Sequence, residues 1–211
     1  MARKKERTRQ KIIEVAIQCF ADYGYDGTSI RTITNYAQVN VSAIAYHFGG
    51  KEKLYLAVIE FILGEMQRTL SPHAFHLMQL INEDHPKSYY RDKIIELLIA
   101  VANKSLEENT KYFFLIVIKE QIKPSVAADI LYERHFNKMF SLIGSLLQKA
   151  SSQQKSELEV KLMTQALLGE AFTFILGISN LKRELNIDEF DSKHIASLKK
   201  ILAMTVEGFC Q

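Results

Sequence analysis

Residues 8–54 place helix-starting and helix-stopping residues so close together that this stretch can form only short helices around a small core. Gly24 and Gly27 bracket the first turn, and Gly49-Gly50 ends the last helix. Ser29 and Asn40 stand where a polar side chain commonly caps the first turn of a helix. The pattern predicts a helix-turn-helix within three helices, at about residues 7–23, 29–36 and 40–48.

The apolar residues of this stretch recur at helical spacing. In the first predicted helix they are Ile12, Ile13, Ala16, Ile17 and Phe20. The third helix is too short to be stable alone, so Ile44 and Phe48, four residues apart, must anchor it to the core. Its other faces carry small side chains, which allow close approach to base edges, and Tyr46 and His47, which can donate to phosphates. The third helix is therefore predicted to read DNA.

Positive charge is concentrated at the start of the chain. Residues 1–53 hold nine Lys and Arg against five Asp and Glu, whereas the other 158 residues hold 18 against 19. Six of the nine cations lie in the first eleven residues: Arg3, Lys4, Lys5, Arg7, Arg9 and Lys11. A basic arm beside a helix-turn-helix favours phosphate contacts. The alternative is a solvated, disordered tail.

The composition indicates an all-α protein with a sizeable core, since 47% of the 211 residues are apolar and only three are Pro. Two cysteines, Cys19 and Cys210, make no disulfide framework. No apolar stretch follows the basic start, and the longest purely apolar run, Phe113 to Ile118, is far shorter than a membrane span. We expect a cytoplasmic protein without a membrane partner.

Chemistry-bearing side chains form no recognisable catalytic or metal site. His73 and His76 are three residues apart and His85 follows, but no Cys or third close His completes a ligand set. We find no Ser-His-Asp or Cys-His signature, Gly-rich phosphate loop or paired-carboxylate motif. We therefore expect no enzymatic activity, no cofactor and no metal.

Many positions of the amino-terminal segment match one known pattern at fixed spacing and without a gap. They are Thr8-Arg9, Ile12-Ile13, Ala16, Phe20, Gly24, Ser29-Ile30, Ile33, Ala37, Val39, Tyr46-His47-Phe48 and Lys51-Glu52-Lys53-Leu54. The segment, about a quarter of the chain, resembles the DNA-binding domain of TetR-family transcriptional repressors. The run AIAYHFGGKEKLYLAV is especially similar to the CecR-like subgroup of that family.

The resemblance implies roles for individual residues. Arg31 matches the position from which some members reach a base edge, where a guanidinium can donate two bonds to guanine. Tyr46, His47 and Lys51 match positions that contact phosphates, Lys51 from the first turn of a helix. For Tyr46 the alternative is packing, and for Lys51 a solvated cation. Small or capping residues at the start of the third helix complete the predicted DNA-binding set: Asn40, Val41, Ser42 and Ala43.

Two residues depart from the family pattern. Gln38 stands where Gly is usual in the turn, so a left-handed conformation there would cost about 1 to 2 kcal/mol. Ala45 replaces the usual aromatic residue of the recognition helix and removes a large contact surface. The base preference therefore does not transfer from any relative.

We predict a DNA-binding domain at residues 1–53 and a helical effector-binding and dimerisation domain at residues 54–211, with about nine helices in all. The fourth helix is expected at residues 51–70, with breaks at Ser71-Pro72 and at residues 82–87. Further helices are expected near residues 88–107, 109–121 and 126–150, followed by two more.

Bulky and adaptable side chains in the second domain predict a pocket for a small apolar or amphiphilic effector. The candidate lining residues are Phe61, Met66, Phe113, Tyr132, His135, Phe136, Met139 and Phe172. The alternative is that they form ordinary core. Tyr132 and His135 are favoured because they add polar groups to an apolar wall.

The last two predicted helices carry apolar and small residues at alternating spacings of three and four, which favours a four-helix interface between two copies. The candidate interface residues are Leu162, Gly169, Thr173, Leu176, Leu198, Leu202 and Thr205. The alternative is that these stripes face the chain's own core.

Together these features predict a ligand-responsive repressor that binds a pseudo-palindromic double-stranded DNA operator as a homodimer. Two alternatives remain open. One is a DNA-binding dimer that responds to no effector, and the other is a helical small-molecule-binding protein that has lost its DNA contacts.

Overall fold

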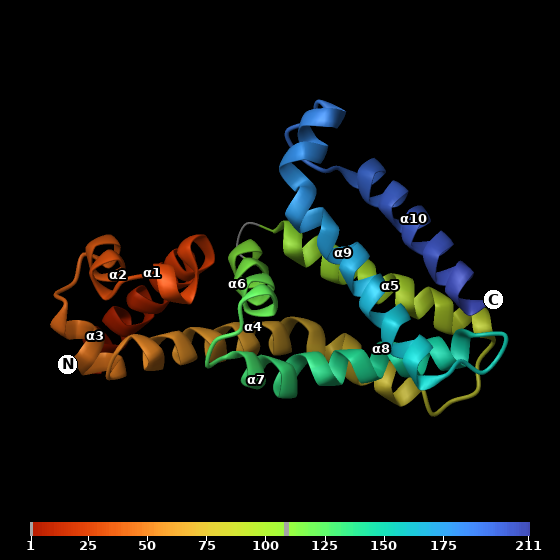
Figure 1. The fold of residues 1–211 in the computed structure, drawn as a ribbon, viewed down its shortest axis with the longest axis horizontal. Coiled ribbons are helices and arrows are strands. Elements are labelled where there is room, and N and C mark those ends of the chain that lie inside the picture. The colour runs from red at the N-terminus through yellow and green to blue at the C-terminus, as the bar shows by residue number, and fades with distance from the viewer. Residues whose placement is uncertain (1, 108–109) are drawn as a thin grey trace. The chain divides into compact units, whose positions relative to one another are not determined.

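The computed structural model describes residues 2–107 and 110–211, and within them the chain is all helical (Figure 1). This confirms the predicted all-α class. The segment predicted as one helix at residues 126–150 consists of three consecutive pieces: α7 (Ala128–Leu131), a π-helical turn η1 (Tyr132–Phe136) and α8 (Asn137–Ala150). The other elements are α1 (Ala2–Gly27), α2 (Ile30–Ala37), α3 (Ser42–Phe48), α4 (Lys51–Leu80), α5 (Lys87–Leu106), α6 (Lys111–Ile122), α9 (Glu157–Leu185) and α10 (Ser192–Cys210).

The first of two compact units comprises Met1–Leu70 and Glu108–Phe136. In it α1 packs against both α2 and α6. The predicted apolar face of α1 is buried together with side chains from α2, α3 and α4 in one core. The short helices α2 and α3 need this packing, because isolated helices of their length are unstable in water. The fully buried members include Ile12, Ile13, Phe20, Ile33, Ile44, Leu54 and Tyr55.

Local hydrogen bonds explain where the short helices begin and end. Ser29 caps α2, its hydroxyl accepting from the Thr32 N–H at 3.0 Å. Gln38 ends α2 in the left-handed conformation, at φ 51° and ψ 48°, so the turn keeps this geometry despite the strain that a Cβ brings there. Gly24 interrupts α1 at φ 72° and Gly49 ends α3 at φ 80°, both values that favour glycine. The predicted helix-turn-helix is therefore present with its predicted turns.

The predicted break at Ser71-Pro72 is wrong, because α4 continues from Lys51 to Leu80. A proline inside a helix costs about 3 kcal/mol, and packing on both sides outweighs that cost. Met66 is buried in one unit and Leu77 in the other. The compact units nevertheless divide at Leu70 and Ser71. The predicted domain boundary between residues 53 and 54 differs from this division and stays a prediction.

The second unit comprises Ser71–Glu107 and Asn137–Gln211. Here α5 packs against α8, α9 and α10, and α8 packs against α9. Capping boxes start the two long carboxy-terminal helices. Ser156 and Glu159 cap α9, and Asp191 and His194 cap α10.

Among the described residues no single helix has the length and apolar content of a membrane span. Only two segments of α9 taken together, Glu157–Thr173 and Leu176–Leu185, reach that length and composition, and they are bent by 53°.

Candidate nucleic-acid interface

The third helix is anchored on one side and open on the other. Ile44 and Phe48 are buried, at 0% and 8% exposure, as predicted. Tyr46 is 70% exposed and Val41 is 50% exposed, while Ser42 and Ala45 also lie on the surface. Tyr46 is therefore not part of the buried core. The helix presents side chains that the protein's own core does not use.

Asn40 fixes the start of this helix. Its Oδ1 accepts from the Ser42 N–H at 2.9 Å and from the Ser42 hydroxyl at 2.8 Å. The helix begins at Ser42 with Val41 at the cap position, so the predicted cap at Asn40 is one residue early. The Asn40 side chain still satisfies one of the free N–H groups that every helix start leaves.

Two cations from α1 lie over the aromatic rings of α3. Lys5 Nζ is 5.0 Å from the centre of the Tyr46 ring, and Arg9 Cζ is 5.3 Å from that of Phe48. The basic arm is helical from Ala2 onward, which differs from a disordered tail. Sequence reasoning missed this pairing. The four-residue spacing of Lys5 and Arg9 could have indicated it, because residues four apart lie on the same face of a helix. The predicted first helix began at about residue 7 and so left Lys5 out.

His47 lies between its neighbours on α3, with ring centres 5.0 Å from Tyr46 and 6.2 Å from Phe48. Its Nδ1 is buried and has no hydrogen-bond partner within the described part of the chain. A polar atom in that condition is rare in folded proteins and calls for a ligand or water.

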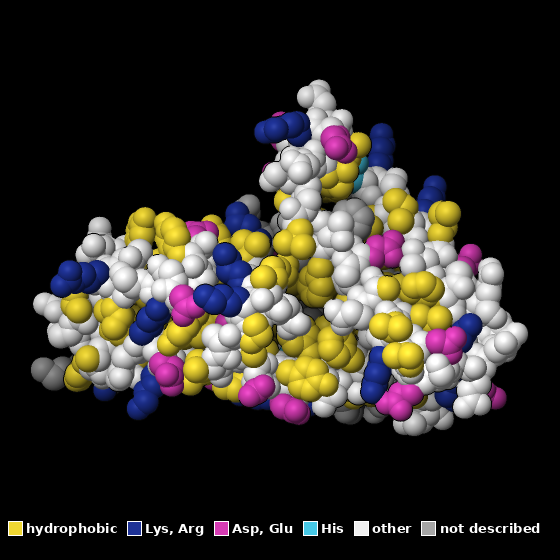
Figure 2. Space-filling model, in the orientation of Figure 1, with side chains coloured by type: hydrophobic (Ala, Val, Ile, Leu, Met, Phe, Trp, Pro, Cys, Tyr) yellow, Lys and Arg dark blue, Asp and Glu magenta, His cyan; other side chains and the backbone are white. Residues whose placement is uncertain are grey.

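Lys51 and Arg31 flank the third helix in sequence. Lys51 is in the first turn of α4, where its Nζ lies 4.5 Å from the centre of the Tyr25 ring and 3.4 Å from the Asp26 carbonyl oxygen. It is therefore held by the protein and is not simply a solvated cation. Arg31 is exposed on α2. Figure 2 shows Lys and Arg side chains on the surface of the region formed by α1, α2 and α3.

The predicted effector residues in the first unit are mixed in burial. Phe61 and Phe113 meet edge to face with ring centres 6.1 Å apart, and Met66 and Phe136 are buried. Tyr132 is 49% exposed.

His135, in the same π-helical turn as Tyr132, is half-buried, and burial lowers the pKa of its imidazole. Met139 and Phe172, in the second unit, are both half-buried.

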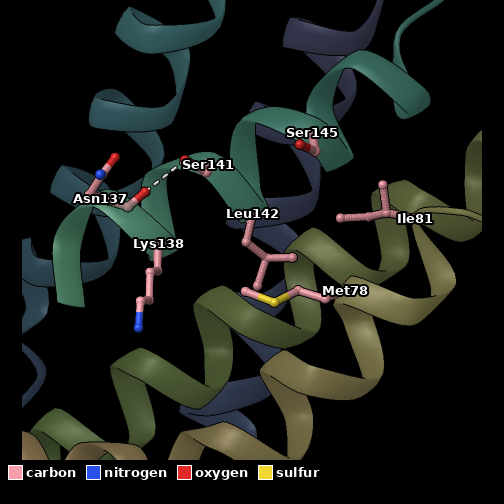
Figure 3. Close-up of a pocket in the computed structure, with 7 residues that line it drawn as sticks. All are labelled: Met78, Ile81, Asn137, Lys138, Ser141, Leu142 and Ser145. Atoms are coloured by element: carbon pink, nitrogen blue, oxygen red, sulfur yellow. Dashed lines mark hydrogen bonds between the residues drawn. The ribbon is translucent and has the colours of Figure 1, made fainter. Parts of the chain in front are cut away.

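A groove of about 270 Å³ lies in the second unit between the end of α4 and α8 (Figure 3). Its apolar lining is Met78, Ile81 and Leu142, and its polar lining is Asn137, Lys138, Ser141 and Ser145. None of these residues was predicted. The expected end of α4 at residue 70 placed Met78 outside any helix, which hid its relation to α8.

The predicted dimer residues divide between surface and core. On α9, Leu162 and Leu176 are 62% and 64% exposed, and Gly169 and Thr173 between them are also exposed. On α10, Leu198 and Leu202 are buried at 4% and 0%, so their predicted place in the interface is wrong. They belong to the chain's own core because α10 packs on α5.

The open face of α10 instead carries Ile201 and Met204, which are 51% and 73% exposed. Thr205, also predicted for the interface, is half-buried and donates a hydrogen bond to Glu170 on α9 at 3.3 Å. This bond links the two helices that present the exposed residues.

No group of three or more His, Cys, Asp or Glu side chains suited to a metal ion occurs among the residues that the structure describes. The side chains of His73 and His76 lie outside the described part.

Two family models match this chain. Residues 12–58 match "Bacterial regulatory proteins, tetR family", and residues 90–208 match "HTH-type transcriptional dual regulator CecR, C-terminal domain". The HTH-type transcriptional dual regulator CecR of Shigella flexneri is 26% identical over 212 residues, which cover 100% of this chain and 95% of that protein.

Solved structures share the fold. A TetR-like transcriptional regulator from Rhodococcus sp. RHA1 has a TM-score of 0.67 at 14% identity, over 95% of this chain and 93% of that one. The structure of AibR in complex with isovaleryl coenzyme A and operator DNA has a TM-score of 0.66 at 12% identity, over 93% of this chain and 97% of that one.

Proposed function

This chain belongs to the TetR family of bacterial regulatory proteins, in the group with a CecR-type carboxy-terminal domain, and on that basis we propose that it binds a pseudo-palindromic operator as an effector-responsive homodimer. The family consists of DNA-binding transcriptional regulators, not enzymes. The similar CecR protein is a dual regulator, and repression is the outcome we propose for this chain.

The observation that carries the proposal is the exposed side of α3 with cations beside it. Val41, Ser42 and Ala43 offer small surfaces to base edges, and Arg31 offers a guanidinium to guanine. Tyr46, His47, Lys51 and Lys5 supply donors and positive charge for the flanking phosphates. This arrangement suits the major groove of double-stranded DNA.

Exposed apolar residues on α9 and α10 support the homodimer. Four large apolar side chains on these two helices are each more than half exposed: Leu162, Leu176, Ile201 and Met204. Exposed apolar surface of this kind commonly marks a site of protein–protein contact. A second copy related by a twofold axis would bury them in a four-helix contact. Such a dimer would present two α3 helices to successive major grooves, about 34 to 36 Å apart.

The effector is proposed to be small and apolar or amphiphilic. The groove beside α8 supports this class, because its lining combines apolar side chains with Ser141, Ser145 and the cation of Lys138. The predicted lining residues of the first unit, with His135 half-buried among them, are the second candidate region. Effector binding would release DNA by favouring a conformation with lower operator affinity.

Selection of bound DNA from a random pool tests the proposal directly. We expect a pseudo-palindrome whose half-sites are centred about one helical turn apart. The Arg31→Ala variant should recover the same half-site with relaxed preference at one position, at a cost of about 1 to 3 kcal/mol there. Selection repeated with candidate apolar carboxylates and their thioesters tests the effector. A chain that recovers no motif, or a motif without symmetry, would contradict the proposal.

A further inference from the structure

Glu120 is a buried carboxylate in α6. It is 4% exposed, and no other Asp, Glu, Lys or Arg among the described side chains is so deeply buried. A carboxylate removed from water is destabilising unless donors surround it. Here it accepts three hydrogen bonds: from Tyr55 Oη at 2.6 Å, from Ser125 Oγ at 2.8 Å and from the Ser125 N–H at 3.0 Å. The donors around Glu120 therefore stabilise a buried carboxylate, and its role in the protein needs an explanation.

The donor Tyr55 ties this carboxylate to the helix-turn-helix. Tyr55 is 2% exposed in the second turn of α4. Its ring lies 4.6 Å from the Phe20 ring of α1 and 4.9 Å from the Tyr25 ring, measured between centres. Tyr25 in turn lies under Lys51 Nζ at 4.5 Å. The hydrogen bond from Tyr55 to Glu120 thus joins α6 to the aromatic cluster on which α1 and the start of α4 rest.

Two surface contacts join α6 to α1 in parallel. Lys119 Nζ donates to the Asp22 carbonyl oxygen at 3.2 Å, and Lys123 Nζ lies 2.6 Å from Asp26 Oδ2. The hydrogen bond and charge of Lys123 lower the pKa of Asp26. Both members of that pair are largely exposed, and exposed pairs contribute little to stability. The buried bond is therefore the dominant polar link.

We propose that Glu120 is a positioning residue for DNA binding, which fixes α6 against α4 and thereby holds α3 and Lys51 in the geometry that binds an operator. The inference rests on the proposed DNA-binding function. Glu120 touches no DNA in this scheme. Tyr55 stands one helical turn after Lys51 on α4, so its position sets that of Lys51 and of the start of α4, to which Gly49-Gly50 joins α3. Preorganised contacts bind more tightly because less freedom is lost on binding.

Glu120→Gln and Tyr55→Phe test the link. The amide of Gln keeps the volume of Glu but loses the charged acceptor, and Phe keeps the Tyr ring but loses the donor. For each variant we expect operator affinity to fall about tenfold, the ratio expected for loss of one charge-assisted hydrogen bond. The double variant should lose little more than Glu120→Gln alone, because that change already weakens the bond that Tyr55→Phe removes. Glu60→Gln, which removes an exposed carboxylate of α4, is the matched control and should bind like the wild type.

Two further measurements separate positioning from other roles. The slope of affinity against salt concentration should be unchanged in Glu120→Gln, since no phosphate contact is removed. Affinity is compared well below the melting temperature of each variant, where a purely stabilising role would leave it unaltered. Wild-type affinity in both Tyr55→Phe and Glu120→Gln overturns the inference, as does a flatter salt slope. If Glu120→Gln does not fold, Tyr55→Phe alone decides between these outcomes. Failure of the wild type to bind any DNA would instead overturn the proposed function.

Discussion

The ammonium group of Lys5 lies 5.0 Å from the centre of the Tyr46 ring, so the basic start of α1 and the exposed side of α3 form one continuous surface. Cation and ring attract each other, and both are free to meet a phosphate. The arm and the recognition helix are therefore expected to act together on DNA.

Replacing Lys5 with Ala should remove one ionic contact with the DNA backbone. We expect weaker binding to all sequences and a salt dependence whose slope is smaller by about one. Fluorescence anisotropy at several salt concentrations measures both quantities. Lys199→Ala, which removes an exposed cation from α10, is the control and should change neither. An unchanged slope in Lys5→Ala would show that the arm does not contact phosphate.

Gln38→Gly should stabilise the protein by up to about 1 kcal/mol, because Gly adopts the left-handed conformation without a Cβ penalty but loses more entropy on folding. The chain contains a matched comparison. Asn186 caps α9 at φ 53°, close to the φ of 51° at Gln38, and Asn tolerates this region better than Gln. Urea unfolding should show a smaller gain for Asn186→Gly. A larger gain at residue 186 would show that backbone strain at Gln38 is already relieved.

Leu162→Glu should weaken or abolish the dimer. A charge at Leu162, on the exposed face of α9, would have to be buried unpaired in the proposed four-helix contact. Light scattering at micromolar concentration should then report the mass of one chain. Ile122→Glu is the control, since Ile122 is 78% exposed but belongs to the other compact unit. If both variants have the same mass as the wild type, the proposed interface is wrong.

His135 predicts an acid-sensitive component of stability. Burial lowers its pKa from the ordinary value of 6.5, so the unfolded chain takes up this proton at a higher pH than the folded chain. The free energy of unfolding is therefore expected to fall as the pH drops through about 6.5 toward the lower pKa of the folded state.

The variant His135→Leu should lose this component. Between about pH 7.5 and about pH 5.5 its urea midpoint is expected to fall less than that of the wild type. An equal fall in the two proteins would show that the imidazole is protonated in the folded state as readily as in the unfolded chain.

The helix-turn-helix was predictable because short-range interactions determine it. Ser29 bonds to a group three residues away, and Gln38 and Gly49 end their helices by bonds to carbonyls within five residues. Both partners of each such bond lie within a few residues of each other, so a short stretch of sequence is enough to predict it. The resemblance added roles for Arg31 and Lys51, which no local pattern would assign.

The parts that were missed depend on contacts between distant segments. The hydrogen bond from Tyr55 to Glu120 joins residues 65 positions apart, and nothing near either residue indicates it. Pro72 indicated a helix end, but packing on either side of it prevailed. On α10 both Leu202 and Ile201 belong to apolar stripes, and only the packing of α5 decides that Leu202 faces inward.

The helical state of residues 2–11 has a calorimetric consequence. A disordered arm that folds on DNA adds the heat capacity and ordering entropy of a folding reaction to the binding reaction. An arm that is already helical adds neither. The heat-capacity change of operator binding should therefore be that of two preformed surfaces meeting, with the arm contributing charge at little entropic cost.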